Sequence, residues 1–207
     1  MDHNLVVVFP APNLWLPELS ESTVLWLLFA CSIKKDCEML DRIPHYVSHR
    51  VQSLYIYKGR LARAYLCCGN HEKAEPILAL FRNSNYRFPD INSFLLDGLY
   101  LGGYYKECIQ TFRTIQSLNL QRLQSNEAPV KIQYTAYSAV LRSFCKEQQT
   151  EGVSSIRSEM MRDDIHLREA DFFALCELYD TLPNWKNVVS KVQSVCASKG
   201  VSLTKEQ

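Results

Sequence analysis

The chain has 207 residues, enough for one ordinary domain or a short stack of helical repeats but too few for two independent catalytic domains. Hydrophobic residues make up 47% and charged residues 22%, which excludes intrinsic disorder because there is ample apolar surface to bury. The 23 Lys and Arg against 22 Asp and Glu leave a formal charge of +1, so the whole chain has no field that attracts a nucleic-acid backbone.

The first 19 residues contain three prolines and no helical period, which predicts an extended arm over residues 1–19. Asp2 and Glu18 precede the first basic residue, Lys34, so the segment shows no Arg-rich mitochondrial import signal. The apolar run over residues 24–33 is shorter than the roughly 20 residues that a membrane span needs. It predicts a buried helix, and no membrane span is expected.

Beyond the arm, apolar residues recur at three- and four-residue intervals, the spacing of one helical face. The pattern predicts an all-α protein of about ten helices, one of them longer than the others. Residues 20–57 are predicted to form N-terminal helices or a cap. Pro44 is predicted to open a helix that runs through residues 50–66.

The stops and starts between the helices have recognisable chemistry. Gly69 suits the left-handed position that ends a helix, and the side chain of Asn70 can cap the next one. Thr150 and Asp90 are likewise placed at helix starts. Pro76 either kinks the helix that Asn70 caps or marks its start.

A repeat of 34–35 residues runs through the larger part of the chain. The predicted units are 58–91, 92–136, 137–171 and 172–205. The second unit is about ten residues longer, and the polar stretch 120–130 is predicted to be an inserted loop. Units of two helices cannot bury their apolar faces alone, so the pattern predicts a right-handed α-solenoid of helix–turn–helix repeats. A generic helical bundle with accidental spacing is the alternative.

The best-defined repeat lies at residues 135–168. It opens on Tyr137, closes its first helix with Phe-Cys-Lys at 144–146 and closes its second with Glu-Met at 159–160. These features resemble the pentatricopeptide repeat, and residues 58–205 are similar to degenerate animal mitochondrial members of that family, including those of the ribosomal small subunit. The resemblance implies an α-solenoid, usually mitochondrial, that binds RNA or is built into a ribonucleoprotein.

In the RNA-reading members of this family, a polar residue early in the first helix and an Asn or Asp at the end of the repeat together select one base. Pro, Arg and Leu cannot supply the selecting carboxylate or amide, and these are the residues at the clear last positions. Base-by-base reading is therefore not expected. The early positions hold Gly59, Ser93, Ser138 and Phe173, and the last positions hold Pro89, Arg168 and Leu203.

Basic and polar residues of the repeats are the candidates for contact with RNA. The first helices line the concave face in such solenoids, where Arg and Lys can hold phosphates and Ser can reach a base. The alternative is ordinary solvated helix charge, which contributes little. The predicted RNA-binding residues are Arg60, Arg63, Ser93, Ser138, Arg142, Lys146 and Arg168.

No sequence motif carries catalytic chemistry. There is no glycine-rich phosphate loop, GxSxG or HExxH, and the adjacent Asp163 and Asp164 align with the turn that ends a repeat. His45 and His49 lie four residues apart but lack a third ligand nearby, and the eight cysteines are interpreted as reduced core residues. No enzyme activity, cofactor, metal or small-molecule substrate is expected.

The sequence favours a non-enzymatic binding scaffold, a structural or assembly component of a mitochondrial ribonucleoprotein such as the ribosomal small subunit. Its near-neutral charge and unsuitable code positions support that hypothesis. A free RNA-binding factor acting on mitochondrial transcripts is one alternative, and a tetratricopeptide-like protein–protein adaptor unrelated to RNA is another. The expected partners are proteins of a complex, RNA, or both. The location is mitochondrial by resemblance, otherwise cytoplasmic or nuclear.

Overall fold

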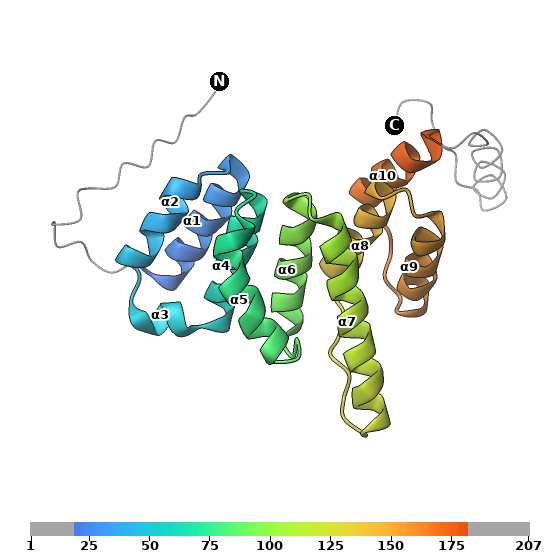
Figure 1. Ribbon diagram of the computed structural model, residues 1–207, viewed down its shortest axis with the longest axis horizontal. Coiled ribbons are helices and arrows are strands. Elements are labelled where there is room, and N and C mark those ends of the chain that lie inside the picture. The colour runs from blue at the N-terminus through green and yellow to red at the C-terminus, as the bar shows by residue number, and fades with distance from the viewer. Residues whose placement is uncertain (1–18, 182–207) are drawn as a thin grey trace.

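A computed structural model describes residues 19–181 of the chain (Figure 1). Over that range all the regular structure is helical, which confirms the predicted all-α class for this part of the chain. Ten α-helices and one 3-10 helix (η1) follow one another between residues 19 and 181: α1 (Glu21–Lys34), α2 (Cys37–Arg42), η1 (Ile43–Tyr46), α3 (His49–Ser53), α4 (Tyr55–Cys67), α5 (His71–Asn83), α6 (Pro89–Leu101), α7 (Tyr105–Gln124), α8 (Tyr134–Lys146), α9 (Thr150–Arg162) and α10 (Glu169–Asp180).

Helices α4 to α9 form three consecutive hairpins, and α10 begins a fourth unit. The first helices of these units begin at Tyr55, Pro89, Tyr134 and Glu169, each three residues before the predicted start of a repeat. The predicted spacing is therefore present in the structure, with every boundary shifted equally. Residues 1–18 of the predicted arm at 1–19, and residues 182–205 of the last predicted repeat, lie outside the described residues.

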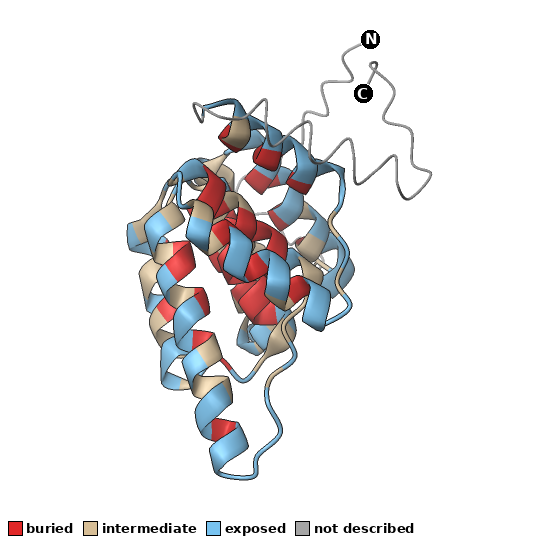
Figure 2. Cartoon of the chain, turned by 90° about the vertical axis from the view of Figure 1, so that its right-hand side faces the viewer, coloured by how far each residue is buried: buried red, intermediate tan, exposed pale blue. Residues whose placement is uncertain are grey.

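The helices form two rows that share a core. Helix α1 packs on α4, α4 on α6, α6 on α8, and α8 on α10, which makes a continuous row of first helices. The second helices α5, α7 and α9 pack on this row rather than mainly on one another. Figure 2 shows the buried residues on the sides of the helices that face their neighbours. Leu66, Leu96, Leu99 and Leu141 lie at the centre of this core with 0–1% of their surface exposed.

The turn between α4 and α5 has the predicted chemistry. Gly69 has a φ of 76° and lies in the left-handed region, where a side chain is strained. The side chain of Asn70 then accepts a hydrogen bond from the backbone N–H of Lys73 at 3.2 Å and caps α5. Of the two possibilities for Pro76, the structure shows a helix that begins earlier, at His71, and runs through the proline.

Two neighbouring first helices approach closely at a glycine. A Cβ atom on Gly98 of α6 would lie 2.9 Å from the Cα of Arg63 in α4, a distance that real Cβ contacts do not show. The absent side chain lets the two helix backbones approach each other there. This close approach brings the side chains of α4 and α6 into direct contact along the row.

The prediction of one long helix from Pro44 through residues 50–66 is wrong. The chain forms the short helices η1 and α3 instead, separated by extended backbone at Val47, and it is extended again at Leu54 before α4 begins. The side-chain N–H of Gln52 stabilises the break by donating to the carbonyls of Pro44 at 2.9 Å and Val47 at 2.7 Å. Side-chain hydrogen bonds to the backbone thus replace helical ones in this segment.

The predicted loop at 120–130 is wrong in its first half, because α7 continues to Gln124 and is the longest helix between residues 19 and 181. Arg122 is buried, and its guanidinium donates to the side chain of Asn119 and to the carbonyl of Asn85. The amide of Asn119 also bonds both backbone groups of Val130 at 2.8 and 2.9 Å. Figure 1 shows the resulting extension of α7 with the following segment running back along it.

Helix α1 is buried on one side only, which corrects the prediction of a buried helix at 24–33. Val24 and Leu28 are buried, whereas 70% of Trp26 and 66% of Ile33 are exposed. None of the helices between residues 19 and 181 combines the length and hydropathy that a membrane crossing requires.

The cysteines of the described residues form no disulfide, and most of them are buried. Burial raises the pKa of the Cys108 thiol to about 12, so almost none of it is the reactive thiolate at pH 8. Cys176 is exposed on α10. We expect iodoacetamide to modify Cys176 quickly and Cys108 only after unfolding, as mass spectrometry of the folded protein will show. Equal labelling of the two would contradict the packing of α7.

Candidate functional site

A hollow of about 280 Å³ opens on the row of first helices. It brings together three of the predicted RNA-binding residues, Arg60, Arg63 and Ser93, which come from α4 and α6. Its walls carry two arginines and two aspartates, so the charges balance. The lining residues are Leu28, Phe29, Arg60, Arg63, Asp90, Ser93, Phe94, Asp97, Gln133 and Thr135.

The guanidinium of Arg63 forms hydrogen bonds with two other side chains of the protein. Its Nε lies 2.7 Å from Oδ2 of Asp97, and its Nη1 donates to Oγ of Ser32 at 3.1 Å. The side chains of Arg63 and Asp97 are each only 18% exposed, which limits screening of the pair by solvent. The guanidinium therefore joins α4 to α6 and α1, and its charge is neutralised by the neighbouring unit.

This pair makes a measurable contribution to stability. A double-mutant cycle with Arg63→Gln and Asp97→Asn, read by urea unfolding, should give a coupling energy of about 1 kcal/mol, at the upper end for exposed pairs because of the partial burial. The matched cycle pairs Arg63→Gln with Asp90→Asn, since Asp90 lines the same hollow but bonds Gln133. That cycle should show no coupling. Equal coupling in both cycles would contradict a specific Arg63–Asp97 pair.

Arg60 differs from its neighbour. Its guanidinium carbon lies 5.1 Å from the centroid of the Phe94 ring, a cation–π distance. Its Nε is buried without a hydrogen-bond partner, and among residues 19–181 no acidic side chain forms an ion pair with it. Arg60 is thus a cation within the hollow that can still bind a carboxylate or phosphate.

Ser93 and Ser138 lie between first helices rather than on an open surface. Ser93 is 4% exposed and its hydroxyl donates to the carbonyl of Pro89 at 3.1 Å, while Ser138 is 2% exposed and its hydroxyl bonds the carboxylate of Asp171. Neither hydroxyl can reach a base unless the helices separate. Their burial counts against the predicted contact with RNA.

Three of the predicted residues converge on Asp171 of α10, which is completely buried. Besides the hydroxyl of Ser138, its carboxylate accepts the backbone N–H of Arg168 at 3.0 Å and the hydroxyl of Tyr134 at 2.7 Å. Nε of Arg142 lies 3.9 Å from Oδ1. Buried carboxylates need such partners, because desolvation of the charge is otherwise costly. The cluster therefore anchors α10 to α8.

The side chains of the last two basic candidates also bind within the protein. Nζ of Lys146 lies 2.7 Å from Oε2 of Glu177, and this hydrogen bond raises the pKa of the lysine. The pair is exposed, so it contributes little to stability. The guanidinium of Arg168 lies 3.9 Å from the centroid of the Tyr134 ring. Both contacts join α8 to α10.

The acidic partners were missed by the sequence analysis, although a signal was present. Asp97 lies 34 residues after Arg63, and Glu177 lies 31 residues after Lys146, close to the repeat period. Residues one period apart lie side by side on neighbouring units, so acids at that distance from the candidate bases predict ion pairs between repeats.

A second and larger groove, of about 1190 Å³, lies between the extension of α7, the segment that follows it, and α9. None of the seven predicted residues lines it. Leu120 and Leu123, on the extension, are 62% and 54% exposed at its edge. Charged side chains, among them Lys131, Glu159 and Arg162, also line this groove.

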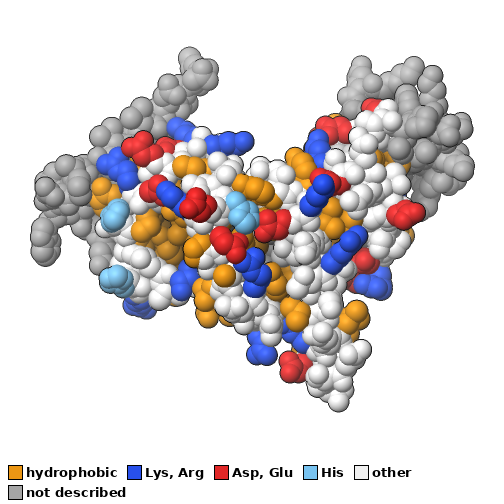
Figure 3. All heavy atoms as spheres, in the orientation of Figure 1, with side chains coloured by type: hydrophobic (Ala, Val, Ile, Leu, Met, Phe, Trp, Pro, Cys, Tyr) orange, Lys and Arg blue, Asp and Glu red, His pale blue; other side chains and the backbone are white. Residues whose placement is uncertain are grey.

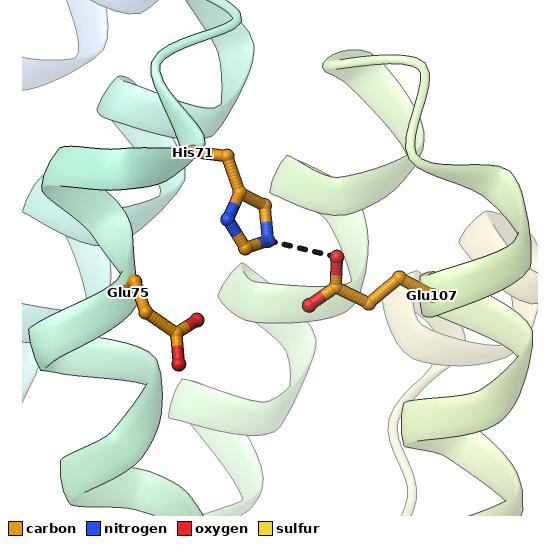
Figure 4. A group of neighbouring side chains, drawn as sticks. All are labelled: His71, Glu75 and Glu107. Atoms are coloured by element: carbon orange, nitrogen blue, oxygen red, sulfur yellow. Dashed lines mark hydrogen bonds and ion pairs between the residues drawn. The ribbon is translucent and has the colours of Figure 1, made fainter.

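The structure does not place His45 and His49 in a group of three metal-ligating side chains within residues 19–181. It instead brings together His71, Glu75 and Glu107, a group that sequence reasoning missed. His71 and Glu75 are four residues apart, and Glu107 lies 36 residues after His71, close to the repeat period, which is the signal that could have found the group. Figure 4 shows the three side chains.

Comparison with known proteins gives no family assignment. No protein-family model matches the chain, and no curated protein is detectably similar to it in sequence.

Proposed function

We propose that the chain is a non-enzymatic scaffold of pentatricopeptide type, a right-handed α-solenoid that serves as a structural or assembly component of a mitochondrial ribonucleoprotein such as the ribosomal small subunit. Three consecutive helical hairpins support the family and the solenoid, as do the starts of the first helices, which are spaced by the repeat period except between α6 and α8. The seven predicted residues belong to the seams between its units. Protein contacts, rather than contacts with an RNA backbone, hold it in the assembly.

One observation carries this proposal. Arg63, Arg142 and Lys146 each have an acidic side chain of the next first helix within 4.0 Å. At Arg63 and Arg142 a phosphate would compete with Asp97 and Asp171, and displacing these carboxylates would leave buried or half-buried acids unpaired. Nucleic-acid affinity depends on cations that are free to pair with phosphate, so these three residues supply little of it.

The hollow and one face of the chain suit a protein partner better than a phosphate chain. In the face drawn in Figure 3, Lys and Arg lie among Asp and Glu and form no continuous basic stripe. The hollow combines the free cation of Arg60 with the rings of Phe29 and Phe94, a setting that suits a carboxylate next to an apolar side chain. The exposed leucines on α7 add apolar contact area at the second groove.

Cross-linking of the natural assembly tests this function. The tagged protein is purified from cells after ultraviolet irradiation, which joins RNA to the peptides it touches, and in parallel after treatment with a lysine cross-linker. We expect lysine cross-links to other proteins and no RNA-linked peptides from residues 55–67, 89–101 or 134–146. RNA-linked peptides from those helices would favour the free RNA-binding factor. Protein cross-links in an assembly without RNA would favour the tetratricopeptide-like adaptor.

A further inference from the structure

Three ligating side chains meet where two neighbouring hairpins face each other (Figure 4). His71 and Glu75 lie one turn apart on the same side of α5, and Glu107 comes from the first turn of α7. One imidazole nitrogen and one oxygen of each carboxylate all lie within 4.8 Å of one another. All three residues are half-buried, so the group is neither sealed from solvent nor fully hydrated.

The imidazole ring is held in place by its surroundings. Nε2 of His71 points at Glu107 and lies 2.8 Å from its Oε2. The ring of Tyr104 packs against the imidazole with the centroids 5.0 Å apart, and the hydroxyl of Tyr104 donates to the carbonyl of Gly69 at 2.8 Å. A ring fixed by such outer contacts is pre-oriented for a ligand at Nε2.

We infer that His71, Glu75 and Glu107 form a binding site for a divalent transition-metal ion such as Zn²⁺. One nitrogen and two carboxylate oxygens are a donor set that Zn²⁺ accepts, with water as the fourth ligand. The metal takes the place of the proton now shared between His71 and Glu107. Ligand atoms of a tetrahedral zinc site are about 3.4 Å apart, so small rotations of the two flexible glutamates close the site.

The contacts of Glu75 distinguish this site from a simple ion pair. Arg82 pairs with one oxygen of that carboxylate and leaves the other for a metal. Glu75 takes no part in the hydrogen bond between His71 and Glu107, yet its carboxylate lies in the same space (Figure 4). A metal bound by all three residues would clamp the α4–α5 hairpin to the α6–α7 hairpin. It would stabilise the folded chain over the unfolded one.

Zinc titration of the full chain, freed of metal with a chelator, tests the site. Calorimetry should show one Zn²⁺ per chain bound at this site, and Glu75→Gln and Glu107→Gln should each weaken the affinity at least about tenfold. The matched control is Glu72→Gln, an exposed residue of the same helix turn, which should bind as the wild type does. Zinc should also raise the thermal midpoint of the wild type and the control.

Two further measurements separate zinc binding at this site from unfolding and from binding by cysteines. Without metal, Glu75→Gln should keep a thermal midpoint close to that of the wild type, because the His71–Glu107 bond is intact and the half-exposed pair with Arg82 contributes little. Its weaker binding then cannot come from unfolding. Co²⁺ bound in place of Zn²⁺ should lack the intense near-ultraviolet absorption of cobalt–thiolate bonds. The site is refuted if the wild type binds no zinc, if Glu75→Gln binds as tightly as Glu72→Gln, or if the cobalt spectrum shows thiolate ligands.

Discussion

Replacing Leu141 with Asp should unfold the chain or lower its free energy of unfolding by at least about 4 kcal/mol. Leu141 is fully buried in the middle of α8, which packs against α6, α7, α9 and α10. A carboxylate there would lose its hydration without gaining a cation. Urea unfolding followed by far-ultraviolet circular dichroism measures the effect.

The matched control is Met161→Asp on the adjacent helix α9. Met161 is 78% exposed, so the new charge stays hydrated and the stability should change by less than about 0.5 kcal/mol. A wild-type urea midpoint for Leu141→Asp would show that α8 is not the centre of the packed row. The register of the whole repeat would then be wrong.

Replacing Asp171 with Ala should cost about 3 kcal/mol, the second largest effect expected. The change removes the acceptor of the Ser138 and Tyr134 hydroxyls and of the Arg168 backbone N–H. It also leaves the guanidinium of Arg142, whose side chain is only 19% exposed, without its carboxylate. Thermal and urea unfolding should both show the loss.

Asp180→Ala provides the control for that experiment, because Asp180 is an exposed aspartate of the same helix. It should change the stability by less than about 0.5 kcal/mol. If both alanine variants were equally stable, the polar cluster would not anchor α10. The proposal that the predicted RNA-binding residues hold the repeats together would lose its main support.

The spacing of the first helices could be predicted because helix starts depend on local chemistry. Apolar spacing and the turn glycine at Gly69 determine where helices stop and start, and the structure shifts each boundary by only three residues. The end of α7 could not be predicted in this way. In the sequence, the polar residues Asn119 and Arg122 are typical of a loop. In the fold, they are helical because they donate hydrogen bonds to the carbonyls of Val130 and Asn85.

In the candidate site, too, local features could be predicted from the sequence, whereas contacts between units were harder to predict. The sequence could place Arg63 and Arg142 on first helices, because that needs only the helical period. The repeat period could also have indicated Asp97 as the partner of Arg63, because the two residues lie 34 residues apart. It could not show that Asp171 would neutralise Arg142, because only the packing between units brings those side chains together. Residues predicted to contact RNA thus prove to contact the next helix.

The most direct test of this account is a salt titration of RNA binding by the purified chain. Fluorescence anisotropy with a labelled single-stranded RNA is recorded from about 50 to 200 mM salt, a range over which several phosphate contacts would weaken binding steeply. We expect weak binding at the lowest salt, with a slope of less than about one phosphate contact, unchanged by Arg142→Gln. Tight binding with a slope of several contacts, reduced by Arg142→Gln, would contradict the account.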